Sequence, residues 1–532
     1  MTGRDDGVDL AGGLLRPSAP AASAATADGT ATATGTTTGT GTAALGDQAM
    51  VDLGLDRLLA PAIADAPWLA EAYTRPCGDP ATIDYRQAVA AQLIDRAIAA
   101  PFERFLTEIR RLQQRLEATI RVTDAVARTT WFLAAAERYL AAVAALHEAI
   151  APLELTAEGL VAARERVATL VASDAHRAVA QEAAAIRAQL DDITFTVRVQ
   201  GGRVTVDRLQ GEPDLAAQVA ATFARFRTGQ ATPIEPSAPE PGSDKVTARI
   251  LALVAAQHPE PFARLATLYE RAQPLIAPEI SQLVAELPFY LGVLPQLRRL
   301  SDAGLPLSYP TVVAHDAACS AEASYDLAVG LSLLSEGEQV VTNDWYLDPP
   351  ERILVVTGAN QGGKTTFARA FAQLHHLGAI GLPVPAAQAT VGLHDRLRTH
   401  FERQEQLTTL RGKLQDELER MHAVLIDATD RSVVVLNETF SSTTLEDARS
   451  LGRTFLERLT TLGARVVYVT FVDELATTAG SVVSMVAGVA EDDPTRRTFR
   501  IVRRPPDGLA HALALAERYG LSEDALRRRF GS

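Results

Sequence analysis

The chain has 532 residues, a formal net charge of −14 and 47% hydrophobic residues. This length exceeds one ordinary domain, and the acidic balance argues against a protein that coats polyanions in general, though not against a local DNA contact. The cysteines are Cys77 and Cys319 alone, which argues against a disulfide framework or a cysteine-based zinc site and fits a reducing cytosol. Neither an apolar run of transmembrane length nor a secretory h-region is found, so we expect a cytoplasmic protein without a membrane partner.

Residues 1–48 are mostly Ala, Thr, Gly and Ser, and large apolar side chains are scarce among them. Such a segment buries too little apolar surface to offset the entropy lost on ordering. We therefore predict that residues 1–48 are disordered, and we assign them no function.

Residues 49–308 carry a mainly helical pattern. Apolar residues recur at three- and four-residue spacing, which is typical of amphipathic helices, and alanine is abundant. Taken locally, this pattern indicates a plain helical bundle with a Pro-rich loop. The segments concerned are 87–98, 102–126, 131–151, 162–190, 215–226 and 246–303, with the loop at 232–242.

The helical pattern is interrupted by two alternating runs, 193–199 and 204–206, on either side of a Gly-Gly pair. Alternation flanking Gly-Gly predicts a β-hairpin. Its arginines, Arg198, Arg203 and Arg208, could touch nucleic acid. Three arginines on a hairpin are more often a solvated face, and both interpretations stay open.

The most informative stretch begins with the apolar run Ile353–Val356, continues as Gly358-x-x-x-x-Gly363-Lys364-Thr365 and passes into a helical pattern. A strand, a glycine-rich loop and a helix in this order predict a phosphate-binding loop, in which backbone N–H groups and the helix N-terminus hold an anion. We expect Lys364 to reach the β- and γ-phosphates of ATP and the Thr365 hydroxyl to hold Mg²⁺. This context disfavours a glycine-rich turn with a surface lysine. The predicted nucleotide-binding residues here are Gly358, Ala359, Asn360, Gln361, Gly362, Gly363, Lys364, Thr365 and Thr366.

A second buried strand, 432–436, ends in Asn437 and Glu438. Glu438 is the candidate that orients an attacking water. Asn437 stands where an aspartate is usual in P-loop ATPases; its amide can hold Mg²⁺ through a water but supplies no charge, so we expect weaker Mg²⁺ affinity or slower turnover. A third strand, 465–470, completes a series that predicts a parallel or mixed α/β sheet flanked by helices.

Ser442, Thr443 and Thr444 precede Glu446 and Asp447, a pattern typical of a capped helix N-terminus. Such a terminus presents N–H groups and hydroxyls that can hold an anion. It serves either its own helix alone or the γ-phosphate of a nucleotide held by another subunit.

The order of these motifs resembles the ATPase domain of the MutS family of DNA mismatch-repair proteins. The resemblance is specific over about 310–530 and weaker over 50–310, where residues 79–87 and the long helices look like the family's core and lever. Thr443 and Asp447 keep the identity that they have in the family's signature loop. The matching segments are 341–344, 357–365 with Asn360, 381–388, 392–395, 412–429 and 438–448, followed by a helical tail at 508–529.

This resemblance implies a multidomain protein: an α-helical core and lever region over 49–308 with a small hairpin near 193–207, and an α/β P-loop ATPase domain of ABC type over 309–505. Residues 506–532 would form a helical dimerisation tail. The implied cofactors are ATP and Mg²⁺, with Lys364 and Glu438 as catalytic residues. A homodimer with composite sites is implied, in which Ser442, Thr443 and Thr444 cap the partner's γ-phosphate.

Departures from the family pattern qualify the expected function. We find no N-terminal mismatch-reading domain and no Phe-x-Glu wedge in a suitable setting, and Phe471 stands where the family has a histidine that senses the γ-phosphate. Together with Asn437, this predicts that ATP is bound more surely than it is hydrolysed. We expect an ATP-driven dimeric clamp on DNA in repair or recombination. The alternative is a nucleotide-gated protein-interaction module with little DNA binding; a small-molecule kinase suits the long helices less well.

Overall fold

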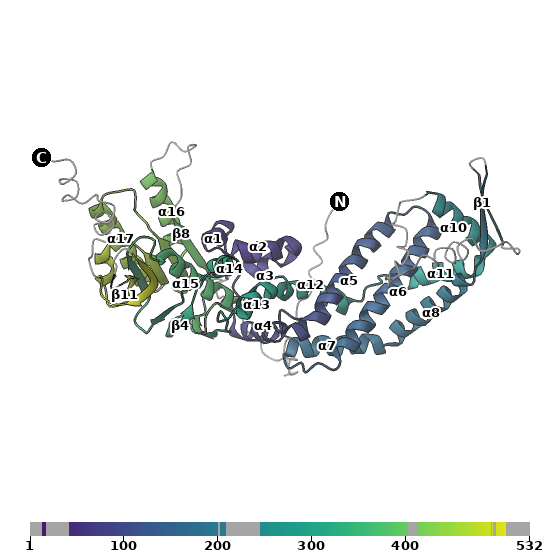
Figure 1. The fold of residues 1–532 in the computed structure, drawn as a ribbon, viewed down its shortest axis with the longest axis horizontal. Coiled ribbons are helices and arrows are strands. Elements are labelled where there is room, and N and C mark those ends of the chain that lie inside the picture. The colour runs from purple at the N-terminus through teal and green to yellow at the C-terminus, as the bar shows by residue number, and fades with distance from the viewer. Residues whose placement is uncertain are drawn as a thin grey trace, which may run out of the picture. The chain divides into compact units, whose positions relative to one another are not determined.

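The computed structural model describes residues 13–17, 42–200, 203–208, 245–402, 413–490, 492 and 496–506 (Figure 1). The chain divides into two compact units, each of which is considered by itself. Unit 1 comprises residues 1–99, 155–160 and 285–532, and unit 2 comprises residues 100–154 and 161–284. The protein is therefore multidomain, with α/β sheets in unit 1 and a helical unit 2.

A six-stranded mixed sheet forms the centre of unit 1, in the order β12-β11-β6-β10-β9-β8. Neighbouring strands from β11 to β8 run parallel, and β12 is antiparallel to β11. The three strands expected from the sequence are β6, β9 and β10, so the prediction of a parallel or mixed sheet is confirmed. The strands are β6 (Ile353–Gly358), β8 (Leu397–Phe401), β9 (Val433–Asn437), β10 (Arg465–Val469), β11 (Val482–Val489) and β12 (Arg497–Arg503).

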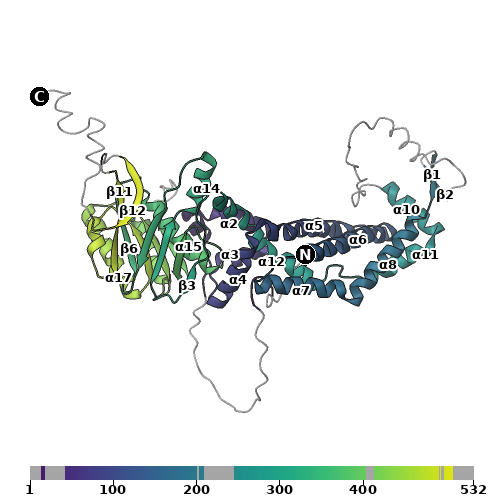
Figure 2. The same ribbon diagram turned by 60° about the horizontal axis from the view of Figure 1, so that its bottom comes forward.

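Helices cover both faces of this sheet (Figure 2). Helix α15 (Lys364–Ala379) lies against β9 and β10, whereas α16 (Lys413–Asp427) and α17 (Leu445–Leu462) share a core cluster with the alternate residues Val434 and Leu436 of β9. Successive side chains of a strand point to opposite faces, and all five residues of β9 are buried. Burial on both faces explains why the strands have continuous apolar runs rather than alternating ones.

A smaller four-stranded sheet lies in the same unit, in the order β3-β7-β4-β5. β3 pairs parallel with β7, and the other pairs are antiparallel. Helix α14 (Leu327–Glu336) connects β4 to β5, and the 3₁₀ helix η2 (Asp473–Thr477) follows β10. The strands are β3 (Thr311–Val313), β4 (Cys319–Ser324), β5 (Asn343–Leu347) and β7 (Gln388–Gly392).

The first helices of the chain pack against α15 rather than with the helical unit. Gln373 Nε2 donates to Leu53 O at 2.7 Å, Arg369 Nε donates to Asp52 O at 2.8 Å, and His376 Nε2 donates to Tyr73 O at 2.9 Å. The predicted domain boundary at residue 309 is therefore wrong. Unit 1 includes α1 (Asp47–Asp52), α2 (Asp56–Asp65), η1 (Pro67–Leu69), α3 (Ala70–Thr74), α4 (Pro80–Leu93) and α13 (Leu294–Asp302).

The prediction of disorder over residues 1–48 is wrong where the structure describes this segment. Leu14 and Leu15 are 0% and 1% exposed, and α1 begins at Asp47. Two leucines are enough to anchor a short piece of a chain whose average composition is poor in apolar residues. Residues 1–12 and 18–41 lie outside the described residues, as do the predicted helix 215–226, the Pro-rich loop 232–242 and residues 507–532 of the predicted C-terminal tail.

Unit 2 consists mainly of long helices, as the sequence predicts. The helix expected over 162–190 is two helices, because the Ser173 hydroxyl accepts a hydrogen bond from His176 N at 3.2 Å and caps a new helix there. In the part of the chain that the structure describes, no helix combines the length and apolarity that crossing a membrane requires. The helices that lie wholly or partly in unit 2 are α5 (Arg96–Ile120), α6 (Ala125–Ile150), α7 (Glu158–Ala172), α8 (Asp174–Asp191), α10 (Lys245–Gln257), α11 (Pro259–Arg271) and α12 (Pro278–Leu291). Residues 285–291 of α12 belong to unit 1.

The predicted hairpin is confirmed as β1 (Phe195–Gln200) and β2 (Arg203–Arg208), which pair antiparallel with Val197 opposite Val206. Gln257 Nε2 of α10 donates to Val206 O at 2.5 Å and ties the hairpin to the helices. The side chains of Arg203 and Arg208 lie outside the described ones. Contact between this hairpin and nucleic acid stays a prediction.

Buried histidines surround the far end of α15. His375 and His376 lie on the helix, His394 follows β7 and His315 follows β3. Burial lowers the pKa of His375 to about 3 and of His376 to about 4, and burial together with nearby Arg465 lowers that of His315 to about 4. Burial also lowers the pKa of His394 well below its usual value. All four are therefore neutral in the folded chain near neutral pH.

These histidines predict that unit 1 loses stability in mild acid. Below about pH 6.5 the unfolded chain binds protons that the folded chain excludes, so the free energy of unfolding falls until the pH reaches the folded-state values. His376 alone would contribute roughly 3 kcal/mol of this loss by about pH 4, at about 1.4 kcal/mol per pKa unit. The urea midpoint of unit 1, measured from about pH 7.5 to 4.5, checks this.

His394→Leu should flatten this pH dependence, because it removes one buried group that only the unfolded state protonates. His422→Gln on the exposed side of α16 is the matched control and should leave the slope unchanged. Equal midpoints for the parent chain at both ends of the pH range would contradict the prediction.

Candidate functional site

The glycine-rich loop, residues 358–363, joins the end of β6 to the start of α15. Gly358 and Gly363 have φ of 104° and 89°, a region that L side chains rarely adopt. A Cβ on Gly358 would lie 2.9 Å from Ala487 O of β11, and one on Gly362 would lie 2.9 Å from Ala359 O. Glycine at these positions therefore allows the loop to turn tightly against β11, as the strand–loop–helix pattern predicts.

Lys364 folds back into this loop. Its Nζ donates to Gly358 O at 2.9 Å, to Ala359 O at 3.2 Å and to Asn360 Oδ1 at 3.2 Å, and the side chain is buried. Burial lowers the pKa of Lys364, and the negative charge of Glu438 opposes this effect. The ammonium group thus lies at the helix N-terminus, in contact with oxygens that carry only partial negative charge.

Thr365 and Asn437 meet across the sheet, as predicted. The Thr365 hydroxyl donates to Asn437 Oδ1 at 2.9 Å, which joins the first turn of α15 to the end of β9. Glu438, the next residue, has φ of 53°, and its N–H donates to Val469 O at 2.9 Å. A left-handed backbone is unusual for glutamate and turns the chain sharply at the end of the strand.

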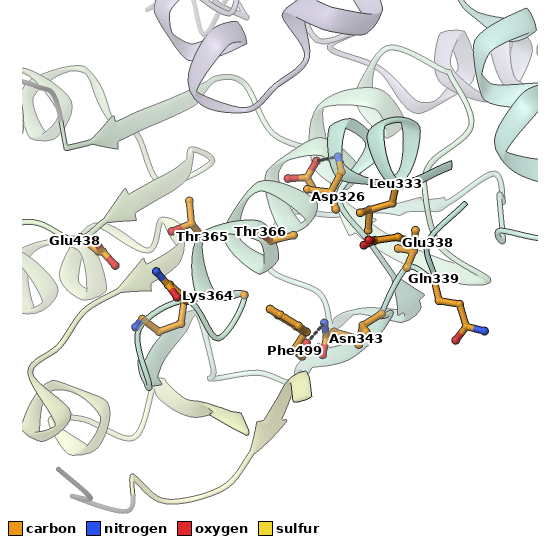
Figure 3. Close-up of a pocket in the computed structure, with 15 residues that line it drawn as sticks. Asp326, Leu333, Glu338, Gln339, Asn343, Lys364, Thr365, Thr366, Glu438 and Phe499 are labelled. Carbon is orange, nitrogen blue, oxygen red and sulfur yellow. Dashed lines mark hydrogen bonds between the residues drawn. The ribbon is translucent and has the colours of Figure 1, made fainter. Parts of the chain in front are cut away.

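A cavity of about 420 Å³ opens in front of the loop (Figure 3). On one side lie Lys364, Thr365, Thr366 and Glu438; on the other, Figure 3 shows α14 and the chain leading into β5, with Phe499 of β12. Predicted residues that line the cavity are Gln361, Gly363, Lys364, Thr365, Thr366 and Glu438. Gly358, Ala359, Asn360 and Gly362 form the loop behind it.

Sequence reasoning missed the far wall of this cavity. Asn343 Nδ2 donates to Phe499 O at 3.2 Å, and Ile501 N donates to Asn343 Oδ1 at 2.6 Å, so this amide fixes the start of β12. Phe499 has φ of 58° and lies 3.6 Å from the position of a Cβ on Gly363. Asn343 belongs to the segment 341–344 singled out above, whereas nothing in the local pattern marks Phe499, Asp326 or Leu333.

Ser442, Thr443 and Thr444 do not line this cavity. They lie at the N-terminus of α17, where Thr444 Oγ1 accepts from Asp447 N at 3.2 Å and the hydroxyls of Thr443 and Thr444 donate to Asp447 Oδ2 at 3.0 and 2.9 Å. Ser442 Oγ donates to Glu417 Oε2 at 3.4 Å. The predicted capped helix is confirmed, and its hydroxyls bind Asp447 and Glu417 of their own chain.

Two large apolar side chains are exposed beside this helix terminus. Leu445 is 58% exposed and Phe471 is 45% exposed. Both line a second, open surface pocket of about 440 Å³ together with residues of η2 and Pro506. Phe471, expected where the family has a histidine, thus lies at the surface near the capped helix and does not line the cavity at the glycine-rich loop.

Comparison with known proteins gives a family match to the C-terminal part of the chain. Residues 354–521 match the model of MutS domain V. The DNA mismatch repair protein MutS of Zymomonas mobilis is 36% identical over 145 residues, which are 27% of this chain and 17% of the relative. The protein of the same name from Thermotoga neapolitana is 29% identical over 201 residues, 36% of this chain and 25% of the relative.

The chain thus spans a quarter or less of the length of these curated relatives. The matched region contains the glycine-rich loop, β9, the capped N-terminus of α17 and β10, which are the elements that build the site. Over this C-terminal portion the chain is similar to MutS domain V and to DNA mismatch repair proteins of the MutS family.

Proposed function

We propose that this chain binds ATP and Mg²⁺ in the cavity at the glycine-rich loop, hydrolyses the nucleotide slowly, and uses it to operate as a dimeric clamp on DNA in repair or recombination. One observation carries the proposal. Lys364, Thr365 and Glu438 line one cavity, and Thr365 is hydrogen-bonded to Asn437 at 2.9 Å. The ends of β6 and β9 thus bring together a cation that can bind phosphate, a hydroxyl that can bind Mg²⁺ and a carboxylate that can orient a water.

The residues present fit a triphosphate. Gly363 is the N-cap of α15 and has no side chain to occupy the first-turn N–H groups, which together with the helix dipole favour an anion. Lys364 exchanges its contacts with Gly358 O and Ala359 O for phosphate oxygens, which carry full negative charge. The buried ammonium then gains a partner that offsets its desolvation.

Thr365 and Asn437 would hold Mg²⁺, the hydroxyl directly and the amide through a water, and the ion would supply positive charge for the phosphates. Because an amide brings no charge, this site would hold the ion less tightly than a carboxylate would. Glu438 would orient the attacking water and accept its proton.

The far wall suits a base. Leu333, Val341 and Phe499 supply apolar surface, and Asn343 is fixed by its own hydrogen bonds with the backbone of β12. Apolar walls with a few placed polar groups are typical of sites for small cofactors. We assign this wall to the nucleoside and the glycine-rich loop to the phosphates.

A second copy of the chain completes the site in this proposal. Ser442, Thr443 and Thr444 do not line the cavity of their own chain, yet they form a capped helix N-terminus at the surface. Such a terminus can cap the γ-phosphate bound by a partner. The exposed Leu445 and Phe471 beside it supply apolar surface for the same interface.

Lys364→Ala should weaken ATP binding at least about a hundredfold, because the buried cation at the helix N-terminus is removed. Titration of a fluorescent ATP analogue measures the affinity. Arg453→Ala, which removes an exposed cation of α17, is the matched control and should bind as the parent does. Unchanged affinity in a folded Lys364→Ala variant would refute the assignment of the loop.

Glu438→Gln should bind ATP but hydrolyse it at least about a hundredfold more slowly, since the amide cannot accept a proton from water. The trapped nucleotide should shift the chain toward dimers, as measured by sedimentation with and without ATP. Glu457→Gln, at an exposed position farther along α17, is the control of equal charge change. A Glu438→Gln variant that turns over like the parent would remove Glu438 from this role.

DNA binding separates the clamp from the nucleotide-gated interaction module. A clamp that touches phosphates should bind duplex DNA with an affinity that falls at least about tenfold between roughly 50 and 200 mM salt. Arg198→Gln should lower the salt slope by about 1 if the hairpin contacts one phosphate. Absence of binding to homoduplex, mismatched and branched DNA at every salt concentration would favour the module.

A further inference from the structure

Residues 13–17, Gly-Leu-Leu-Arg-Pro, form a short segment that is docked into unit 1. Gly13, Leu14 and Leu15 are buried, and the two leucines are 0% and 1% exposed. The side chain of Arg16, by contrast, is exposed. The segment therefore presents two adjacent apolar side chains inward and its charged residue outward.

Four hydrogen bonds join the backbone of this segment to side chains of α4 and α12. Tyr85 Oη donates to Gly13 O at 2.5 Å, Tyr290 Oη donates to Leu14 O at 2.6 Å, and Arg86 Nε donates to Leu15 O at 3.0 Å. Leu14 N donates to Glu286 Oε2. Three successive carbonyls and one N–H are thus satisfied by α4 and α12.

The groups that hold the segment are themselves buried. Arg86 is 6% exposed, Glu286 1%, Tyr290 0% and Tyr85 8%. Burying a charged or hydroxyl group is costly unless it is hydrogen-bonded, so a guanidinium and a carboxylate in such a place require polar partners. The backbone of residues 13–15 supplies partners for all four side chains.

The groove is also connected to the helix that carries the glycine-rich loop. Arg86 Nη1 donates to Ile380 O at 3.2 Å, and Ile380 is the C-cap of α15. A Cβ on Gly381 would lie 2.4 Å from Arg86 Cβ, so only glycine permits this approach. One guanidinium therefore bridges the docked segment and the end of α15.

We propose that Tyr85, Arg86, Glu286 and Tyr290 form a peptide-binding groove in this chain, and that its occupant is the chain's own Gly13–Pro17 segment. Recognition rests on backbone hydrogen bonds, which fix the direction of the segment, and on two leucine side chains, which supply apolar burial. The hydrogen bonds and the buried leucines on which recognition rests do not involve the side chain of Arg16, which is exposed.

The groove can be tested with the 532-residue chain carrying Leu14→Asp and Leu15→Asp, which should release the segment. A labelled peptide of residues 11–19 should bind this variant saturably. The same peptide should bind the parent chain at least about tenfold more weakly, because the parent's groove is occupied. The same peptide with Leu14→Asp should bind at least about tenfold more weakly, whereas Arg16→Gln in the peptide should change nothing. Equal binding of all three peptides would overturn the proposal.

If the double variant does not fold, amide hydrogen exchange of the parent chain measures whether the segment is docked. The Leu14 amide should exchange at least about tenfold more slowly than in the free 11–19 peptide, and Tyr290→Phe should shorten that protection. Protection should be independent of protein concentration. Exchange at the free-peptide rate would overturn the proposal, and so would protection that is lost on dilution, since a second copy would then supply the segment.

Discussion

The hydrogen bond between Thr365 and Asn437 is the contact on which the geometry of the site depends. β6 and β9 are not neighbours in the sheet, because β10 lies between them, so their ends are about 10 Å apart. The glycine-rich loop carries the chain from β6 toward β9 and places the first turn of α15 against the end of that strand. The same turn brings Lys364 and Glu438 to one cavity.

Asparagine preserves this geometry while changing its electrostatics. An aspartate at position 437 would accept the same hydrogen bond from Thr365 and add a full negative charge beside the phosphate site. The amide leaves Glu438 to supply negative charge near Lys364, and that charge already supports protonation of the lysine. If the proposed function holds, such a site would bind the nucleotide through backbone and lysine, interact weakly with the metal and turn over slowly.

Helix α15 is restrained at both of its ends. Its N-terminus carries Lys364 and Thr365, while Gln373 and His376 donate to carbonyls of the N-terminal helices and its C-cap accepts from Arg86. Because a packed helix moves as a rigid body, a displacement of α15 at the glycine-rich loop would also displace the groups that make these contacts. The helices that precede the sheet in sequence are thus mechanically part of unit 1, together with the glycine-rich loop.

The sequence predicts the central elements because their signals are local and contiguous. The strands ending at Gly358 and Asn437 are short apolar runs, and the capped N-terminus at Thr444 is specified within four residues. The far wall of the cavity could not be predicted, since Asp326 and Phe499 come from distant segments that only the fold brings together. The domain boundary was misplaced because an amphipathic pattern shows that a helix face is buried but not what it packs against. Leu14 and Leu15 were missed because composition averaged over 48 residues hides two adjacent anchors.

The hydroxyls at the N-terminus of α17 complete the physical argument for a site shared between copies. Hydrogen bonds to Asp447 hold Thr443 and Thr444 in a fixed orientation, and this costs side-chain entropy. The helix itself needs only Thr444, its N-cap, to be fixed in this way. Leu445 and Phe471 expose apolar surface beside them, a cost that a lone copy does not recover. Covering this surface with a second copy would remove both costs and would place an anion-binding helix end over a triphosphate. ATP binding and dimerisation would then be two descriptions of one equilibrium, because each supplies the contacts that the other lacks.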